Sequence, residues 1–297
     1  MGRCRRHVRP AGTNVLCHRF VSGVVKLDPD SPEANFNLRL ALTQTGSPQQ
    51  AVKPLDRAVQ ARPGLTPARL ALGSVTLDLR RPSEAEDQLE AALEAEPQSL
   101  HALHNLGRAL IDQGKYAAAI PPPTKASDLE PSVVDHQLLF GVAYTAAGLS
   151  DKAIAVLQKT PSTFPQSPDA HMNLATALAR KEPYEPAAAS YKEVIKLDPA
   201  NQEARLSLGK VLMRLHQYEE ALAAAEAYIE KRPVPFKEFD ARHLRGVALR
   251  QTGRFEEAEK ELSRAVELDP EYADAQYNLG FVLARLGKLA PGAQPGS

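Results

Sequence analysis

The chain has 297 residues, of which 43% are apolar and 24% charged, a composition typical of globular rather than disordered proteins. Its 36 basic and 36 acidic residues give a formal charge of zero, which argues against a nucleic-acid-binding protein because such proteins carry a basic excess. Two cysteines cannot build a disulfide framework, and no apolar run is long enough to span a membrane. We therefore expect a soluble, cytoplasmic protein with neither nucleic acid nor membrane as its partner.

The first 27 residues are distinct in charge from the rest of the chain. They contain six basic residues and no acidic one, which leaves 30 basic against 36 acidic residues, or about −6, in residues 28–297. Residues 1–15 are expected to form a basic, disordered head, and they lack the apolar stretch of a secretory signal. Residues 16–27 are predicted to form the last helix of a truncated preceding repeat.

From residue 28 onward the sequence repeats with a period of 34 residues. Prolines mark this period at Pro29, Pro63, Pro97, Pro131, Pro165, Pro199 and Pro233, and Pro270 follows after 37 residues. When these prolines are numbered position 32 of each repeat, position 20 is always alanine: Ala51, Ala85, Ala119, Ala153, Ala187, Ala221 and Ala258. Position 8 is mostly glycine: Gly73, Gly107, Gly141, Gly209, Gly246 and Gly280. Position 7 is leucine or phenylalanine, except at Arg245.

Each repeat is predicted to form a helix, a tight turn and a second helix. Small residues at positions 8 and 20 allow the two helices to cross closely, and leucines at positions 7 and 11 share one face of the first helix. Proline at position 32 lacks an N–H group and ends the second helix. A single repeat cannot bury its apolar face alone, so the repeats must stack on one another.

The combination of Leu-Gly at positions 7 and 8, alanine at 20, an apolar residue at 24, a small residue at 27 and proline at 32 resembles the tetratricopeptide repeat family. The resemblance covers roughly residues 28–287, as seven full repeats and the first helix of an eighth. It implies an all-α, right-handed superhelical solenoid of helix-turn-helix repeats. The tryptophan that the family often has at position 4 is absent, because the chain contains none.

Two segments inside the array depart from the pattern. Three prolines, Pro121 to Pro123, fall within the second helix of the third repeat, and we expect that helix to split near Ile120 because an interior proline costs about 3 kcal/mol. The alternatives for these prolines are a hinge, a ligand for an SH3-like partner or a tolerated local defect. Pro54 is expected to kink its helix. Three extra residues around Val234-Pro235-Phe236 predict a longer turn between the sixth and seventh repeats.

The ends of the array lack an evident polar cap, which solenoids need. Residues 288–297 are predicted to be a disordered tail. We therefore expect the chain to be a fragment of a longer reading frame, and self-association through the uncapped ends is an alternative.

No motif predicts catalysis, a metal or a cofactor. His101 and His104 are three residues apart, with Asp135 and His136 in the next repeat, but their spacing matches no recognised metal site, and solvated or groove-lining histidines are the favoured interpretation. A zinc site is rejected on the same ground for the N-terminal set Cys4, His7, Cys17 and His18. We expect no enzyme activity.

In proteins that resemble this family, positions 2, 5, 6, 9, 12 and 13 of the first helix line a concave groove. Position 6 supplies Asn37, Asn105, Asn173 and Asn278, whose amides could pair with a peptide backbone like the asparagine ladder of O-linked N-acetylglucosamine transferases. The alternative is that asparagine is simply common at this position. Position 5 supplies His104, His243 and Tyr277 and lacks the lysine of the chaperone-tail clamp. Positions 9, 12 and 13 supply the basic residues Arg108, Arg180, Lys210, Arg214, Arg250 and Arg285.

These positions predict a groove that is more basic toward its C-terminal half and that favours an acidic, extended segment of a partner. The basic residues would equally complement the dipoles of their helices. We expect a scaffold that binds a protein or peptide in the groove. The alternative is the substrate-presenting part of a larger enzyme of the glycosyltransferase or peptidase type.

Overall fold

The computed structural model describes residues 23–25, 27–44, 48–230 and 235–288. Within these residues all regular secondary structure is α-helical and no strand occurs, so the predicted all-α fold is confirmed. Residues 23–25 and 27 are helical, whereas the predicted head, the rest of the helix predicted before residue 28 and nearly all of the predicted tail lie outside the described residues. The chain divides into two compact halves, residues 1–148 and 149–297.

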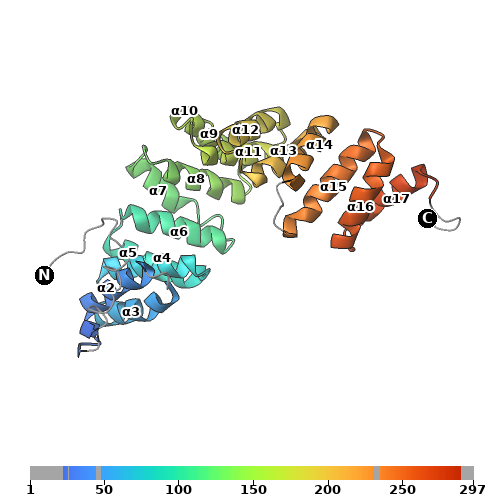
Figure 1. The fold of residues 1–297 in the computed structure, drawn as a ribbon. Coiled ribbons are helices and arrows are strands. Elements are labelled where there is room, and N and C mark those ends of the chain that lie inside the picture. The colour runs from blue at the N-terminus through green and yellow to red at the C-terminus, as the bar shows by residue number, and fades with distance from the viewer. Residues whose placement is uncertain (1–22, 26, 45–47, 231–234, 289–297) are drawn as a thin grey trace. The chain divides into compact units, whose positions relative to one another are not determined.

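The first half is a stack of helices in which each helix packs on the next, and the first helices of successive repeats, α4 with α6 and α6 with α8, also touch (Figure 1). Its helices are α2 (Pro32–Gln44), α3 (Pro48–Ala61), α4 (Thr66–Asp78), α5 (Pro82–Ala95), α6 (Leu100–Asp112), α7 (Pro121–Leu129) and α8 (Val134–Ala146).

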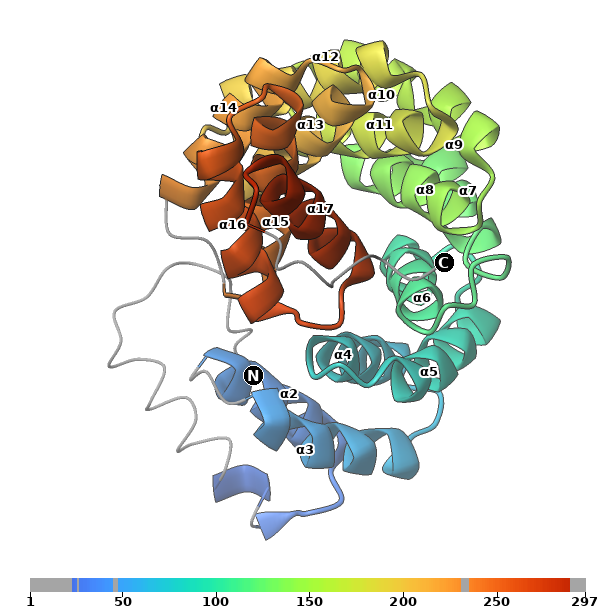
Figure 2. The same ribbon diagram turned by 90° about the vertical axis from the view of Figure 1, so that its right-hand side faces the viewer.

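The second half repeats this packing, with α11 to α17 each resting on the helix before it, and with α13 touching α15 and α15 touching α17 (Figure 2). Its helices are α9 (Ser150–Leu157), α10 (Lys159–Thr163), α11 (Pro168–Lys181), α12 (Tyr184–Leu197), α13 (Gln202–Arg214), α14 (Tyr218–Glu230), α15 (Pro235–Gln251), α16 (Phe255–Leu268) and α17 (Ala273–Arg285). None of the described helices is both long enough and apolar enough to cross a membrane.

Small residues are required where the two helices of a repeat cross. Every alanine at position 20 is fully buried: Ala51, Ala85, Ala119, Ala153, Ala187, Ala221 and Ala258. A Cβ atom added to Gly246 would lie 2.6 Å from Cγ of Leu262, and one added to Gly73 would lie 2.7 Å from Cγ of Leu89. The prediction that small residues permit close crossing is therefore confirmed.

In each repeat from the second onward, the turn after the first helix contains one residue with left-handed backbone geometry, at position 15. Four repeats have glycine there, Gly114, Gly148, Gly253 and Gly287, with φ between 67° and 78°. Three have a residue with a side chain: Arg80 (φ 60°), Glu182 (φ 79°) and His216 (φ 58°). This geometry strains any residue that carries a Cβ atom.

Polar side chains at position 4, where the family often has tryptophan, close the turn between successive repeats. In six repeats a side-chain nitrogen at this position donates to the carbonyl oxygen of the position-32 proline six residues earlier, at 2.5 to 3.2 Å. The donors are Asn35, Arg69, Gln137, His171, Arg205 and Gln276. We call this hydrogen bond the proline clasp. It satisfies a carbonyl group in the turn after the helix that would otherwise need water.

The prolines behave largely as predicted. In every repeat whose second helix and position-32 proline are both described, the helix ends two residues before that proline. In the third repeat residues 116–119 form a turn and α7 begins only at Pro121, so the predicted split near Ile120 is confirmed. The fourth repeat was not expected to split, yet its second helix is divided into α9 and α10, with Pro161 inside α10.

The two remaining departures from the repeat pattern, Pro54 and the three-residue insertion, concern helices α3 and α15. Helix α3 continues through Pro54. The prediction of a longer turn at the extra residues is wrong for Pro235 and Phe236, which are the first residues of α15, and Val234 lies outside the described residues. Proline is well suited to the first position of a helix, because the N–H it lacks has no partner there. The insertion therefore contributes to a first helix of 17 residues.

Candidate peptide-binding surfaces

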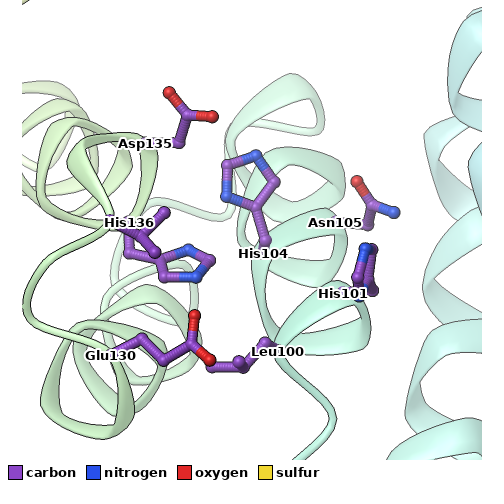
Figure 3. Close-up of a pocket in the computed structure, with 8 residues that line it drawn as sticks. Leu100, His101, His104, Asn105, Glu130, Asp135 and His136 are labelled. Atoms are coloured by element: carbon purple, nitrogen blue, oxygen red, sulfur yellow. The ribbon is translucent and has the colours of Figure 1, made fainter.

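A pocket of about 360 Å³ opens between α6 and the start of α8 in the first half. Its lining residues are Leu100, His101, His104, Asn105, Glu130, Val133, Asp135 and His136. The rings of His104 and His136 are turned toward one another with their centroids 5.6 Å apart, and Asp135 and Glu130 lie on either side of His136 in the view of Figure 3. The sequence placed these two histidines in adjacent repeats, and the structure brings them together. We call this cavity the histidine pocket.

The two facing rings of this pocket are shielded from solvent, and the neutral form of His104 is favoured. Burial lowers the pKa of His104, and the charges of His136 and Arg108 lower it further, while Asp135 acts in the opposite direction. The Nδ1 atoms of both rings are buried and have no hydrogen-bond partner, and His136 is only 7% exposed. Among the described residues no group of three or more histidine, cysteine or acidic side chains is arranged to hold a metal ion.

Two of the predicted groove cations in the second half are already paired within the protein. Nζ of Lys210 lies 2.8 Å from a carboxylate oxygen of Asp240. Nε of Arg214 donates to the hydroxyl of Tyr184 at 3.1 Å, and its guanidinium lies 3.5 Å from Glu182 and 5.4 Å from the centre of the Tyr184 ring. A partner carboxylate would have to compete with these contacts.

Two further cations of the second half, Arg250 and Arg285, share one aromatic ring. The guanidinium carbon of Arg250 lies 4.9 Å from the centre of the Phe281 ring, and that of Arg285 lies 5.5 Å from it. Neither arginine has an acidic partner in the part of the chain that the structure describes, and Nε of Arg250 is buried without a hydrogen bond. Stacking on an aromatic face fixes a guanidinium while leaving its N–H groups available. We call Arg250, Phe281 and Arg285 the arginine pair site.

Aromatic residues at position 5 of the last two repeats differ in exposure. The ring of His243 stacks on Phe239 at 5.9 Å and meets the edge of Tyr272 at 5.3 Å. Burial lowers the pKa of His243, although Asp274 and Asp240 raise it in part. Tyr277 by contrast is 70% exposed, so most of its ring faces solvent.

The four asparagines at position 6 lie in different environments. Asn37 is exposed and Asn173 half-buried, whereas Asn105 donates to the hydroxyl of Ser74 at 2.9 Å. Asn278 is buried and donates to the carbonyl oxygen of Asp274 at 2.6 Å, within its own helix. The amides of Asn105 and Asn278 are thus already engaged. The two remaining predicted residues, Arg108 on α6 and Arg180 on α11, are exposed.

An ion-pair network explains why arginine interrupts the leucine pattern at position 7. Arg245 binds Glu261 at 2.7 Å and Glu226 at 3.1 Å, and Glu261 also binds Arg242 at 2.9 Å. The Glu261 side chain is only 11% exposed, so this carboxylate joins α15 to α16 in place of an apolar contact. The network therefore links the two helices through charge rather than through apolar packing.

The sequence identified the predicted site residues but not the side chains that contact them. Phe281 occupies position 9, which is one of the predicted groove positions, and this position could have identified it from the sequence. The sequence had already drawn attention to His136. Glu130 lies outside the predicted groove positions, so its place in the histidine pocket became evident only from the packing of α6 against α8.

Comparison with solved structures relates the chain to repeat proteins of the same architecture. It is 21% identical to YrrB, described as a TPR protein with an unusual peptide-binding site, over 62% of this chain and 95% of that one, with a TM-score of 0.53. It is 17% identical to a chain of the APC/C assembly Cut9–Hcn1, over 91% of this chain and 52% of that one, with a TM-score of 0.66. A tetratricopeptide repeat protein from Parabacteroides merdae is 15% identical, over 85% and 99% of the two chains, with a TM-score of 0.64.

These likenesses show the fold, and family models show the family. No curated protein matches the chain. Models described as tetratricopeptide repeat match residues 70–122, 110–180 and 178–239, and a model described as TPR repeat matches residues 246–287. The matched segments span most of the helices and agree with the 34-residue period. The chain therefore belongs to the tetratricopeptide repeat family.

Proposed function

We propose that the chain is a non-catalytic scaffold that binds an acidic segment of a protein partner, and that the arginine pair site is a principal contact. The observation that carries this proposal is that Arg250 and Arg285 are stacked on Phe281 and have no carboxylate partner among the described residues. Two oriented guanidinium groups match carboxylates well, because each offers parallel N–H donors.

The surroundings of the site support a peptide ligand. Tyr277 lies on α17, the helix that also carries Phe281 and Arg285, and it is largely exposed. An aromatic side chain beside a cationic pair is the composition expected of a contact that binds strongly. The description of YrrB as a peptide-binding TPR protein is consistent with this proposal.

The first experiment measures fluorescence anisotropy of a labelled decapeptide of alternating aspartate and glycine, with a lysine–glycine decapeptide as the opposite charge. The arginine pair site, in the second half of the chain, should bind the acidic peptide more tightly than the basic one. Added salt should weaken the complex with the acidic peptide. The double variant Arg250→Gln/Arg285→Gln should lose about tenfold in affinity.

Arg214→Gln is the matched control, because its guanidinium is already bound to Tyr184 and Glu182. It should change affinity by less than about threefold. Equal losses in the two variants, or an acidic peptide that binds no better to the wild-type chain than to the double variant, would contradict the proposal. Circular dichroism of each variant verifies the fold.

A further inference from the structure

We propose that the histidine pocket binds the cationic side chain of a lysine or arginine from a protein partner at neutral pH. The identity of the ligand as a protein side chain rests on the proposed scaffold function, whereas the pocket and its chemistry do not. The pocket lies wholly within the first half and shares no residue with the arginine pair site.

The first step is that the two imidazoles present lone pairs. A neutral imidazole carries one proton, on either Nδ1 or Nε2. Both Nδ1 atoms, of His104 and His136, are buried and unpaired. Buried N–H groups without an acceptor are rarer than buried acceptors without a donor. We therefore assign the proton to Nε2 in each ring and a free lone pair to Nδ1, so the pocket lacks a donor that a ligand can supply.

The second step is that the pocket is negatively charged when its histidines are neutral. Glu130 and Asp135 contribute two carboxylates to its lining, and neither has an ion-pair partner in the part of the chain described by the structure. Together with the two Nδ1 atoms they form a set of acceptors. An ammonium group with three donors or a guanidinium with five donors satisfies such a set, whereas a carboxylate would leave it unsatisfied and repelled.

The third step concerns the charges that oppose a cation. Arg108 lies one turn after His104 on α6 and is exposed, and it does not line the pocket. Its charge acts on His104, as do those of His136, Asp135 and the exposed His101. Protonation of His104 in acid adds like charge beside the ligand. Binding of a cation should therefore weaken as pH falls, which distinguishes this pocket from a surface that binds cations through carboxylates alone.

The experiment uses the full chain labelled with ¹³C-histidine and records the imidazole Cε1–Hε1 resonances by NMR. The probe is a capped pentapeptide with a central lysine flanked by glycines, and the control peptides carry norleucine or glutamate at the centre. The resonances of His104 and His136 are assigned from His104→Gln and His136→Gln. We expect the lysine peptide to shift both resonances in a saturable manner at pH 7.5 and to bind at least about fivefold more weakly at pH 5.

Variants at the charged residues test the sign of the interaction. Glu130→Gln/Asp135→Asn should weaken the lysine peptide about fivefold or more, and Arg108→Gln should strengthen it about twofold. Arg250→Gln/Arg285→Gln should leave it unchanged, so failure of this proposal and failure of the proposed function are separate outcomes. Equal shifts with norleucine or glutamate, tighter binding at pH 5, or saturation of both rings by equimolar Zn²⁺ that excludes the peptide would each overturn the proposal.

Discussion

The crossing of α15 and α16 provides a direct test of why glycine occupies position 8. In Gly246→Ala the new methyl carbon would lie 2.6 Å from Cγ and 2.8 Å from Cδ2 of Leu262, and 3.3 Å from the backbone nitrogen of Leu262. Favourable carbon contacts are about 3.5–4.0 Å. Leu262 is fully buried and cannot move aside without displacing its neighbours.

The magnitude follows from two opposing contributions. Overpacking of this kind costs about 1–3 kcal/mol, while replacing glycine by alanine inside a helix gains about 1 kcal/mol. The expected net result is a loss of about 1 kcal/mol in the free energy of unfolding. Gly280→Ala is the matched control at the same repeat position, because its Cβ would meet nothing within 4 Å. It should gain up to about 1 kcal/mol.

The assay is urea unfolding followed by far-UV circular dichroism, with hydrogen exchange to locate the change within α15 to α17. The comparison between the two variants isolates the steric contribution, because the gain in helix propensity is common to both. We expect the variants to differ by about 2 kcal/mol. A difference below about 0.5 kcal/mol would refute the argument that close crossing is what requires glycine at this position.

Three further predictions concern stability. Glu261→Gln should reduce the free energy of unfolding by about 2 kcal/mol, since it leaves two partly buried arginines without their shared carboxylate, and urea titration measures the loss. Burial would raise the pKa of Glu86, but hydrogen bonds from Lys115 and Gln113 and the charge of Lys115 lower this pKa overall. The stability that the Glu86 carboxylate contributes is therefore present above about pH 4.5 and is lost as pH falls through the lowered pKa. Glu86→Gln should make the wild-type and variant midpoints converge in acid, and a constant gap between pH 7 and pH 3 would contradict this. Arg80→Gly should raise the thermal midpoint, with a gain of about 0.5–1 kcal/mol, because φ there is 60°; an unchanged or lower midpoint would show that this backbone is not strained.

The sequence predicted the features that recur at fixed positions. The position-32 prolines, the buried alanines at position 20 and the interrupted helix at Pro121 all follow from local physical rules, because a missing N–H group or a missing side chain acts on the residue's own helix or on the one it crosses. The family assignment followed from the same positions. These features depend on period alone and need no knowledge of distant partners.

The features that the sequence did not reveal depend on pairs of residues far apart in the chain. Arg245 looked like an interruption of the apolar pattern until its contact with Glu261, sixteen residues later, became visible. Lys210 and Arg250 have the same charge and both occupy predicted groove positions, yet one is paired with Asp240 and the other is stacked on Phe281. Charge at a predicted groove position therefore does not by itself indicate which side chain is available to a partner.

The proline clasp has a consequence for how such an array changes in length. Its donor and acceptor are six residues apart. Both are therefore copied or deleted together with a 34-residue segment, provided that the ends of the segment do not fall between them. Asparagine, arginine, glutamine and histidine all serve as the donor, so point substitutions among these types keep the junction intact. A newly duplicated repeat would thus arrive with its junction already made and would be free to diverge on its ligand-facing side.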